Sequence, residues 1–367
     1  MKTCKPALFA AMTLFAAPAI MVQTSAQNQE ITSEATAKGK IIKFDVPGAG
    51  TGSGQGTQPI GINIRGLIAG YYSDSNGVNH GFLRTPNGDI TTFNGPGSDN
   101  AVAIGPNLKG AITGFYEDSS NVIHSFLRDP HGNITTLAED PEAGAGRGTY
   151  AENINDYGVI AGFYFDSNGE DHGFLRTPGG KFHNFDPQGS VGTYTGAFSS
   201  LNDLGDIAGG YLDSNGVSHG YLRAANGHIT PFSVKGAAGT ASYTINNFEV
   251  IAGDYTDSSG ASHGLLRARN GGITRFDITG AGTGAEQGTI PENINDLGVI
   301  AGSYIDSNGV SHGFLRALRG AITKFDVPGA GTGSGQGTTA QSNNLEGATM
   351  GYYVDSSGAY HGFLRTP

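Results

Sequence analysis

The chain has 367 residues, of which 61 are glycine, and it contains 19 Phe and 15 Tyr but no Trp. Glycine at this frequency interrupts long helices, while the aromatic residues supply core material that disordered chains lack. The formal net charge of −11 argues against a nucleic-acid partner, because phosphate binding needs clustered Lys and Arg. The composition therefore predicts a turn-rich β protein.

The first 26 residues are typical of a secretory signal peptide. Lys2 and Lys5 precede an apolar run over 7–22, and the small residue Ala26 suits the last position before a cleavage site. The run is short for a membrane span, which needs about 20 residues. We therefore expect a mature chain that begins at Gln27, has no membrane span and is secreted, either periplasmic or extracellular.

Two features of the N-terminal region bear on the mature chain. The single cysteine, Cys4, precedes the apolar run, so the mature chain forms no disulfide. Residues 27–39 are polar and lack a hydrophobic period, which favours a flexible leader before the folded domain at 40–367.

The rest of the chain consists of seven copies of one unit. Each copy contains a variant of Tyr-x-Asp-Ser-x-Gly-x-x-His-Gly-Phe-Leu-Arg, preceded by a variant of Ile-Asn-x-x-Gly-x-Ile-Ala-Gly. The motif histidines are 44 to 49 residues apart. The motif asparagines are Asn63, Asn107, Asn155, Asn202, Asn246, Asn295 and Asn344.

Each unit divides into four short strands. The first ends at the Ile-Asn pair, the second is Gly-x-Ile-Ala-Gly-x-Tyr, the third is His-Gly-Phe-Leu-Arg, and the fourth resembles residues 90–93. The Asp, Asn and Gly residues between them tolerate the positive φ that tight hairpin turns require. Four strands in a repeat of 40 to 50 residues are typical of one propeller blade.

The two ends of the chain complement each other. Residues 41–45 form a lone fourth strand, and residues 361–365 form a lone third strand. Pairing the two completes the seventh unit and removes an exposed sheet edge. We therefore predict an all-β fold, a seven-bladed β-propeller of four-stranded blades, with the last blade closed by the N-terminal strand.

The repeated His-Gly-Phe-Leu-Arg string, with Asn-x-x-Gly-x-Ile-Ala-Gly upstream, resembles the bacterial extracellular HAF-repeat family. The likeness covers roughly residues 40 to 367. It implies an extracellular bacterial location and a propeller-like repeat fold, and it implies no activity. Some copies depart from the pattern: Ser125 replaces a motif glycine, and Tyr221 and Leu265 replace the motif phenylalanine.

The repeated histidines favour a structural role. A residue in every unit occupies seven equivalent places around a ring, which suits packing better than one reactive centre. An imidazole beside a tight turn can bond the turn's Asp or Ser, as His80 could with Asp74 or Ser75. The expected structural pairs are Asp74 with His80, Asp118 with His124, Asp166 with His172, Asp213 with His219, Asp257 with His263, Asp306 with His312, and Asp355 with His361.

The sequence predicts neither a metal site nor a catalytic residue. One Asp-Ser-x-Gly loop offers a single carboxylate, whereas calcium takes six to eight oxygen ligands, so calcium remains an alternative only where neighbouring loops contribute ligands. The mature chain also has no cysteine and no Gly-x-Ser-x-Gly elbow. His131, His183 and His228 lie outside the motif, and we expect them to be surface residues. We expect no cofactor.

Binding residues are expected where the repeats differ. The longest connections join a fourth strand to the next first strand, and in a propeller they share one face with the Asp-Ser-x-Gly loops. Loops on a rigid scaffold are where binding residues concentrate. The candidates are Asp140, Glu142, Arg147, Tyr150, Glu152, Glu286, Gln287 and Glu292, with Gln55 and Gln336 at the equivalent place in other units.

The leading functional hypothesis is a secreted, monomeric, non-catalytic binding module for a glycan, a peptide or a surface protein, with Glu152, Glu292 and Tyr150 as the main binding residues. Tyr with amides and carboxylates can stack on a sugar and bond its hydroxyls. One alternative is a propeller lyase or hydrolase that uses a His at the channel mouth and carboxylates with a divalent metal. Another is a structural envelope or matrix protein.

Overall fold

A computed structural model describes residues 33–36, 39–137, 142–144, 148–195 and 200–367 of the chain. All regular structure in these ranges is β-strand, and no helix in them could cross a membrane. The expected signal peptide lies outside the described residues, as do Asp140 and Arg147. Residues Ser33–Thr36, within the expected flexible leader, instead form strand β1, which pairs with β2.

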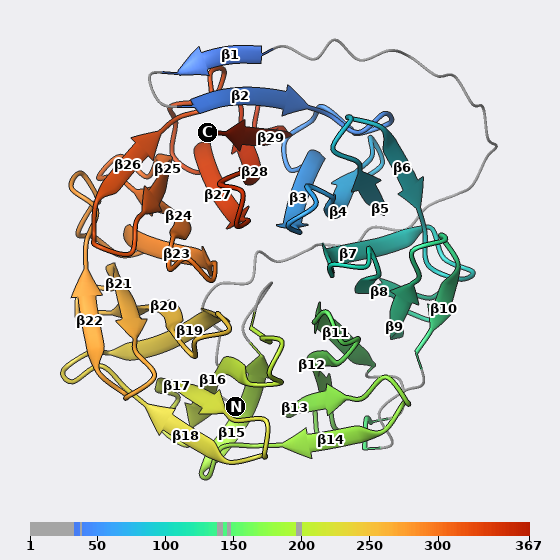
Figure 1. The fold of residues 1–367 in the computed structure, drawn as a ribbon, viewed down its shortest axis with the longest axis vertical. Coiled ribbons are helices and arrows are strands. Elements are labelled where there is room, and N and C mark those ends of the chain that lie inside the picture. Colours follow the sequence, from blue (N-terminus) through green and yellow to red (C-terminus); the bar gives the residue numbers. More distant parts are fainter. Residues whose placement is uncertain (1–32, 37–38, 138–141, 145–147, 196–199) are drawn as a thin grey trace.

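The strands form repeated four-stranded antiparallel sheets around a common centre (Figure 1). The first strand of each unit is innermost. These first strands are β3 (Gly56–Ile62), β7 (Asn100–Pro106), β11 (Thr149–Ile154), β15 (Ser190–Thr195), β19 (Gly239–Ile245), β23 (Gly288–Ile294) and β27 (Gly337–Asn343). The second strands are β4 (Ile68–Ser73), β8 (Ile112–Glu117), β12 (Ile160–Phe165), β16 (Ile207–Asp213), β20 (Ile251–Thr256), β24 (Ile300–Ile305) and β28 (Thr349–Val354).

The third and fourth strands lie progressively further from the centre (Figure 1). The third strands carry the His-Gly-Phe-Leu-Arg string and are β5 (Asn79–Arg84), β9 (Ile123–Arg128), β13 (Asp171–Arg176), β17 (Ser218–Arg223), β21 (Ser262–Arg267), β25 (Ser311–Arg316) and β29 (Tyr360–Thr366). The fourth strands are β6 (Ile90–Phe93), β10 (Ile134–Thr136), β14 (Phe182–Phe185), β18 (Ile229–Phe232), β22 (Ile273–Phe276), β26 (Ile322–Phe325) and β2 (Gly39–Phe44).

The N-terminal strand β2 pairs antiparallel with the C-terminal strand β29, as the chain ends predict. The register places Ile41 opposite Arg365 and Phe44 opposite Gly362. Single parallel bridges also connect some consecutive units, such as Ser311 with Gly337. Strand pairing therefore joins four of the units and β1 into one 17-stranded sheet, while the other three units are separate sheets.

The core lies between neighbouring units. The motif phenylalanine of each third strand, such as Phe82, and the motif isoleucine of the second strand, such as Ile68, are fully buried. The motif arginine is placed over an aromatic ring, as Arg84 is over Phe44 at 4.8 Å. Tyr221 and Leu265 occupy the phenylalanine position and are also fully buried, so these substitutions keep an apolar group in the same place.

The Asp-Ser-x-Gly turns are fastened by their aspartate. Asp74 Oδ1 accepts the backbone N–H groups of Asn76 and Val78 at 2.8 and 2.9 Å, and Gly77 has a φ of 81°. Asn121 takes this glycine position in the second unit with a φ of 61°, which asparagine tolerates better than most residues. The turn chemistry therefore sets the hairpin between the second and third strands.

Candidate functional site

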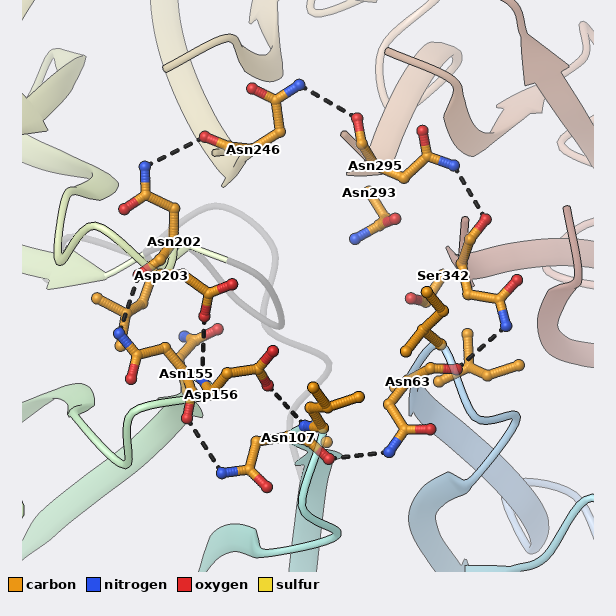
Figure 2. Close-up of a pocket in the computed structure, with 18 of the residues that line it drawn as sticks. Asn63, Asn107, Asn155, Asp156, Asn202, Asp203, Asn246, Asn293, Asn295 and Ser342 are labelled. Carbon is orange, nitrogen blue, oxygen red and sulfur yellow. Dashed lines mark hydrogen bonds between the residues drawn. The ribbon is translucent and has the colours of Figure 1, made fainter. Parts of the chain in front are cut away.

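A closed ring of asparagines surrounds one end of the central channel (Figure 2). The side-chain Nδ2 of Asn63 donates to the backbone oxygen of Asn107 at 2.8 Å. In the same way, the Nδ2 of each following motif Asn donates to the backbone oxygen of the motif Asn in the next unit, at 3.0 to 3.2 Å. These donors are Asn107, Asn155, Asn202, Asn246 and Asn295. Asn344 completes the ring by donating to the oxygen of Asn63 at 3.1 Å.

Each ring asparagine also holds the turn that follows its own strand. In the fifth unit, Asn246 Oδ1 accepts the N–H groups of Phe248 and Val250, both at 3.0 Å. The asparagine thus uses its amide oxygen within the unit and its amide nitrogen between units. This double use explains why no other side chain fills the position: Asp lacks the donor, and Gln is one methylene too long for the local turn.

The ring surrounds a cavity of about 390 Å³. The cavity is lined by the ends of the first strands and the turns after them, with apolar groups such as Ile62, Ile154 and Ile294 beside the amides of Asn153 and Asn293. These turns follow the first strands, whereas the connections predicted to bind a ligand precede them. The cavity therefore lies at the opposite end of the channel from the predicted loop-rich face.

The residues that directly follow the ring asparagines give the cavity mouth an apolar half and a polar half. Three consecutive units, counting across the chain ends, place Leu345, Ile64 and Leu108 there, and the other four place Asp156, Asp203, Asn247 and Asp296. In the polar half, Asp156 Oδ1 accepts the N–H of Leu108 at 2.6 Å, and Asn247 Nδ2 donates to Asp296 Oδ2 at 2.9 Å. The sequence motifs do not single out this polar arc, because its only signal is the variation in the residue that directly follows an invariant asparagine.

A β-bulge interrupts the first strand just before the ring. In five units the residue skipped by the ladder is the third one before the ring asparagine: Ile60, Glu152, Tyr243, Glu292 and Gln341. Bulges re-aim side chains and are common beside functional sites. The ladder is thus broken at a position whose residue type changes from unit to unit.

Glu152 occupies the bulge of the third unit and lines the cavity. Only 5% of the residue is exposed, and its Oε2 accepts the hydroxyl of Thr195 at 2.8 Å. Burial raises the pKa of Glu152 to about 8, against which the Thr195 bond acts. At neutral pH the carboxyl is therefore mainly protonated and can both donate and accept a hydrogen bond.

Glu292 occupies the same position in the sixth unit. Burial, and then the charge of Asp254, raise the pKa of Glu292 to about 7. Gln341 Nε2 donates to Glu292 Oε2 at 3.5 Å. Asp254 is itself buried, and its Oδ1 accepts the hydroxyl of Tyr243 at 2.8 Å. The interior of the molecule thus carries several carboxyl groups whose charge is suppressed by burial.

The other predicted binding residues have roles within the fold. Tyr150 stacks on Phe163 at 4.7 Å between ring centroids and meets Phe115 edge-on. Glu142 accepts the hydroxyl of Tyr164 at 3.0 Å. Tyr150 therefore packs among aromatic rings, whereas Glu142 is exposed, and its binding role stays a prediction.

The predicted glutamines and Glu286 lie on the loop-rich face. Gln287 Oε1 accepts the N–H of Gly284 at 3.0 Å, and its Nε2 donates to the oxygen of Ser307 at 3.3 Å. Gln55 and Gln336 make the matching bonds in their units. These bonds tie the long connections to the Asp-Ser-x-Gly turns, which places both kinds of loop on one face. Glu286 is exposed with a φ of 62°.

Each motif histidine stands between its turn aspartate and its unit's tyrosine. The distances from Nε2 to the aspartate Oδ2 run from 2.9 Å for His124 to 3.8 Å for His172 and His312. The ring stacks on the tyrosine, as His80 does on Tyr72 at 4.9 Å. In His361, Nδ1 also contacts Asp45 at 3.0 Å, which links the last third strand to the residue after β2.

The remaining histidines lie away from the cavity. His131, His183 and His228 are exposed, and none of the described residues that line the cavity is a histidine. Among the described residues, one group of potential metal ligands is close enough to share an ion: Asp166, Glu170 and His172. These residues belong to a motif turn, and three ligand atoms fall short of what calcium requires.

Comparison with solved structures places the fold among β-propellers. The chain is similar to virginiamycin B lyase from Staphylococcus aureus, with 15% identity, a TM-score of 0.58, and coverage of 90% of this chain and 100% of that one. It is also similar to the BP39L lectin from Burkholderia pseudomallei, with 12% identity, a TM-score of 0.54, and coverage of 82% and 92%.

A third similar structure is the β-propeller domain of the Trilobed protease from Pyrococcus furiosus, with 10% identity, a TM-score of 0.53, and coverage of 84% and 94%. At these identities the likeness shows the fold alone. No family model matches the chain, and no curated protein matches it. The class that the fold defines, a β-propeller of repeated four-stranded sheets, includes both binding proteins and enzymes.

Proposed function

We propose that the chain is a seven-bladed β-propeller of the HAF-repeat type, closed by β2, which acts as a secreted, monomeric, non-catalytic binding module without a cofactor. Its ligand is held in the central cavity at the asparagine ring, and we put forward a glycan as the ligand class. The observation that carries this proposal is the cavity of about 390 Å³ whose lining includes the buried carboxyl of Glu152.

The chemistry of the cavity fits hydroxyl groups. Protonated Glu152 and the amide of Asn153 can each donate and accept, as a sugar hydroxyl does. Ile62, Ile154 and Ile294 offer apolar surface to the C–H face of a sugar ring. The similar lectin supports a glycan, although only as a member of the same fold class.

The enzyme alternative requires a histidine beside carboxylates at the channel. The described lining contains none, so this alternative lacks the base that it needs there. The envelope or matrix alternative predicts self-association, which sedimentation of the purified chain measures directly.

The test is a glycan array probed with the full chain, followed by titration of each hit against Glu152→Ala. We expect binding to weaken at least tenfold, because the variant loses the buried carboxyl that lines the cavity. Glu286→Ala is the matched control, since Glu286 is exposed on the opposite face, and it should bind normally. An array without hits, or equal affinity of the Glu152→Ala variant, rejects the proposal. Circular dichroism verifies that both variants fold.

A further inference from the structure

A second cavity, of about 270 Å³, lies beside the asparagine ring, and its lining comes from two units, β19–β22 and β23–β26. These two units are neighbours around the centre in Figure 1. Its walls are three large apolar side chains that are unusually open to solvent: Phe248 is 62% exposed, Leu297 59% and Leu318 71%. Val250, Leu266 and Ile294 also line it, together with Arg316, whose guanidinium lies over the Phe276 ring at 4.7 Å. We call this feature the apolar groove.

Comparison among the repeats shows that the groove is peculiar to one pair of units. Phe248 and Leu297 each lie two residues after a ring asparagine, where the other units have Arg65, Lys109, Tyr157, Leu204 and Glu346. Leu318 lies in the turn between the third and fourth strands, where the other units have Pro, Ala or Arg. Three large apolar residues therefore converge only here, and isolated exposed apolar residues would have needed no explanation.

The inner end of the groove is acidic. Asp296 lines both the groove and the central cavity, and Asn247 Nδ2 bridges it to Asp203 at 2.9 and 3.2 Å. Each Asp296 oxygen accepts one bond from Asn247. A carboxylate has about four acceptor positions, so Asp296 can still accept bonds from an incoming donor. Asp156 and Asp203 line the same mouth as Asp296, and we call these three carboxylates the acidic arc.

We propose that the apolar groove docks a peptide segment of a partner protein, which inserts a large apolar side chain between Phe248 and Leu318 and places a neighbouring Lys or Arg against Asp296. The apolar side chain gains burial in a preformed pocket. The cation complements an arc of three carboxylates in a chain whose net charge is −11.

The charges around the apolar groove favour a basic peptide over the other possible occupants. An anionic membrane surface is repelled by the acidic arc, and a glycan finds few hydrogen-bonding groups among the apolar walls. A second copy of the chain would set the arc near another acidic surface. The docking site is independent of the glycan proposal, because its walls lie outside the central cavity.

The experiment selects binders from a display library of random heptapeptides against the full chain, with counter-selection on the Phe248→Ser/Leu318→Ser double variant. We expect enriched peptides to carry an aromatic or large aliphatic residue within two positions of Lys or Arg. Fluorescence polarisation then measures each synthetic peptide. Leu318→Ser should weaken binding at least tenfold, and Asp296→Asn should weaken it several-fold and reduce its dependence on salt.

Tyr157→Ser is the matched control, because Tyr157 occupies the position of Phe248 in the third unit and is 70% exposed but does not line the groove. It should leave peptide binding unchanged, and so should Glu152→Ala, which separates this proposal from the glycan one. No enrichment over the double variant, enriched peptides without a basic residue, or unchanged affinity in Leu318→Ser would each overturn the proposal. So would a wild-type dimer in sedimentation that Leu318→Ser dissociates, since the occupant would then be a second copy.

Discussion

The ring asparagines join all seven units through side-chain hydrogen bonds between neighbours. The sequence reveals the seven copies, but the amide partner of each lies on the next unit, 44 to 49 residues away for neighbouring units. We expect Asn246→Ala to lower the free energy of unfolding by about 3 kcal/mol, because a buried inter-unit bond and two turn bonds are lost. Urea denaturation measures the change.

A second asparagine provides the control for this prediction. Asn270 Oδ1 also accepts a turn N–H, that of Gly272 at 3.0 Å, but Asn270 is exposed and belongs to an outer hairpin. Asn270→Ala should cost less than about 0.5 kcal/mol, as surface substitutions usually do. Equal losses in the two variants would show that the inter-unit bond contributes nothing beyond the local turn.

The buried carboxyl of Glu152 makes stability depend on pH. Its pKa is about 8 in the folded chain and near 4.3 when unfolded. The unfolded chain therefore releases this proton first, so the stabilising contribution is complete below about pH 4 and is lost as pH rises to about 8. We expect the melting temperature of the wild type to fall between pH 5 and 8 relative to Glu152→Gln. Parallel curves for the two proteins would contradict the raised pKa.

The first strand is the element that sequence patterns describe least well. The strand positions follow from alternation and turn residues, and their number per unit is confirmed by the ladders. The connection residues Tyr150 and Glu152 nevertheless belong to β11, and Glu292 belongs to β23. The bulge explains the difference, because an extra residue breaks the alternation on which a strand is recognised. A position that looks like a variable loop is therefore a strand residue beside the channel.

At the scale of the molecule, the repeats and the chain ends predict the propeller class, and the pairing of β2 with β29 is confirmed. The sequence does not predict which end of the channel holds the cavity. That depends on where side chains from seven units converge, and the ring at Asn63 and Asn344 joins residues 281 positions apart. The sequence does not predict the acidic arc or the apolar groove for the same reason, since each combines single substitutions from different units.

The pairing of the N-terminal strand β2 with β29 predicts that removal of β2 destabilises the whole molecule. A chain that begins at Val46 lacks β2 and leaves β29 as an open edge, so we expect a large fall in melting temperature and aggregation through that edge. A chain that begins at Gly39 lacks β1 but keeps β2, and it should melt close to the wild type. Thermal melting and size-exclusion chromatography compare the two. Should both melt alike, closure by β2 would not be what keeps the ring intact, and the bonds between the ring asparagines would have to suffice alone.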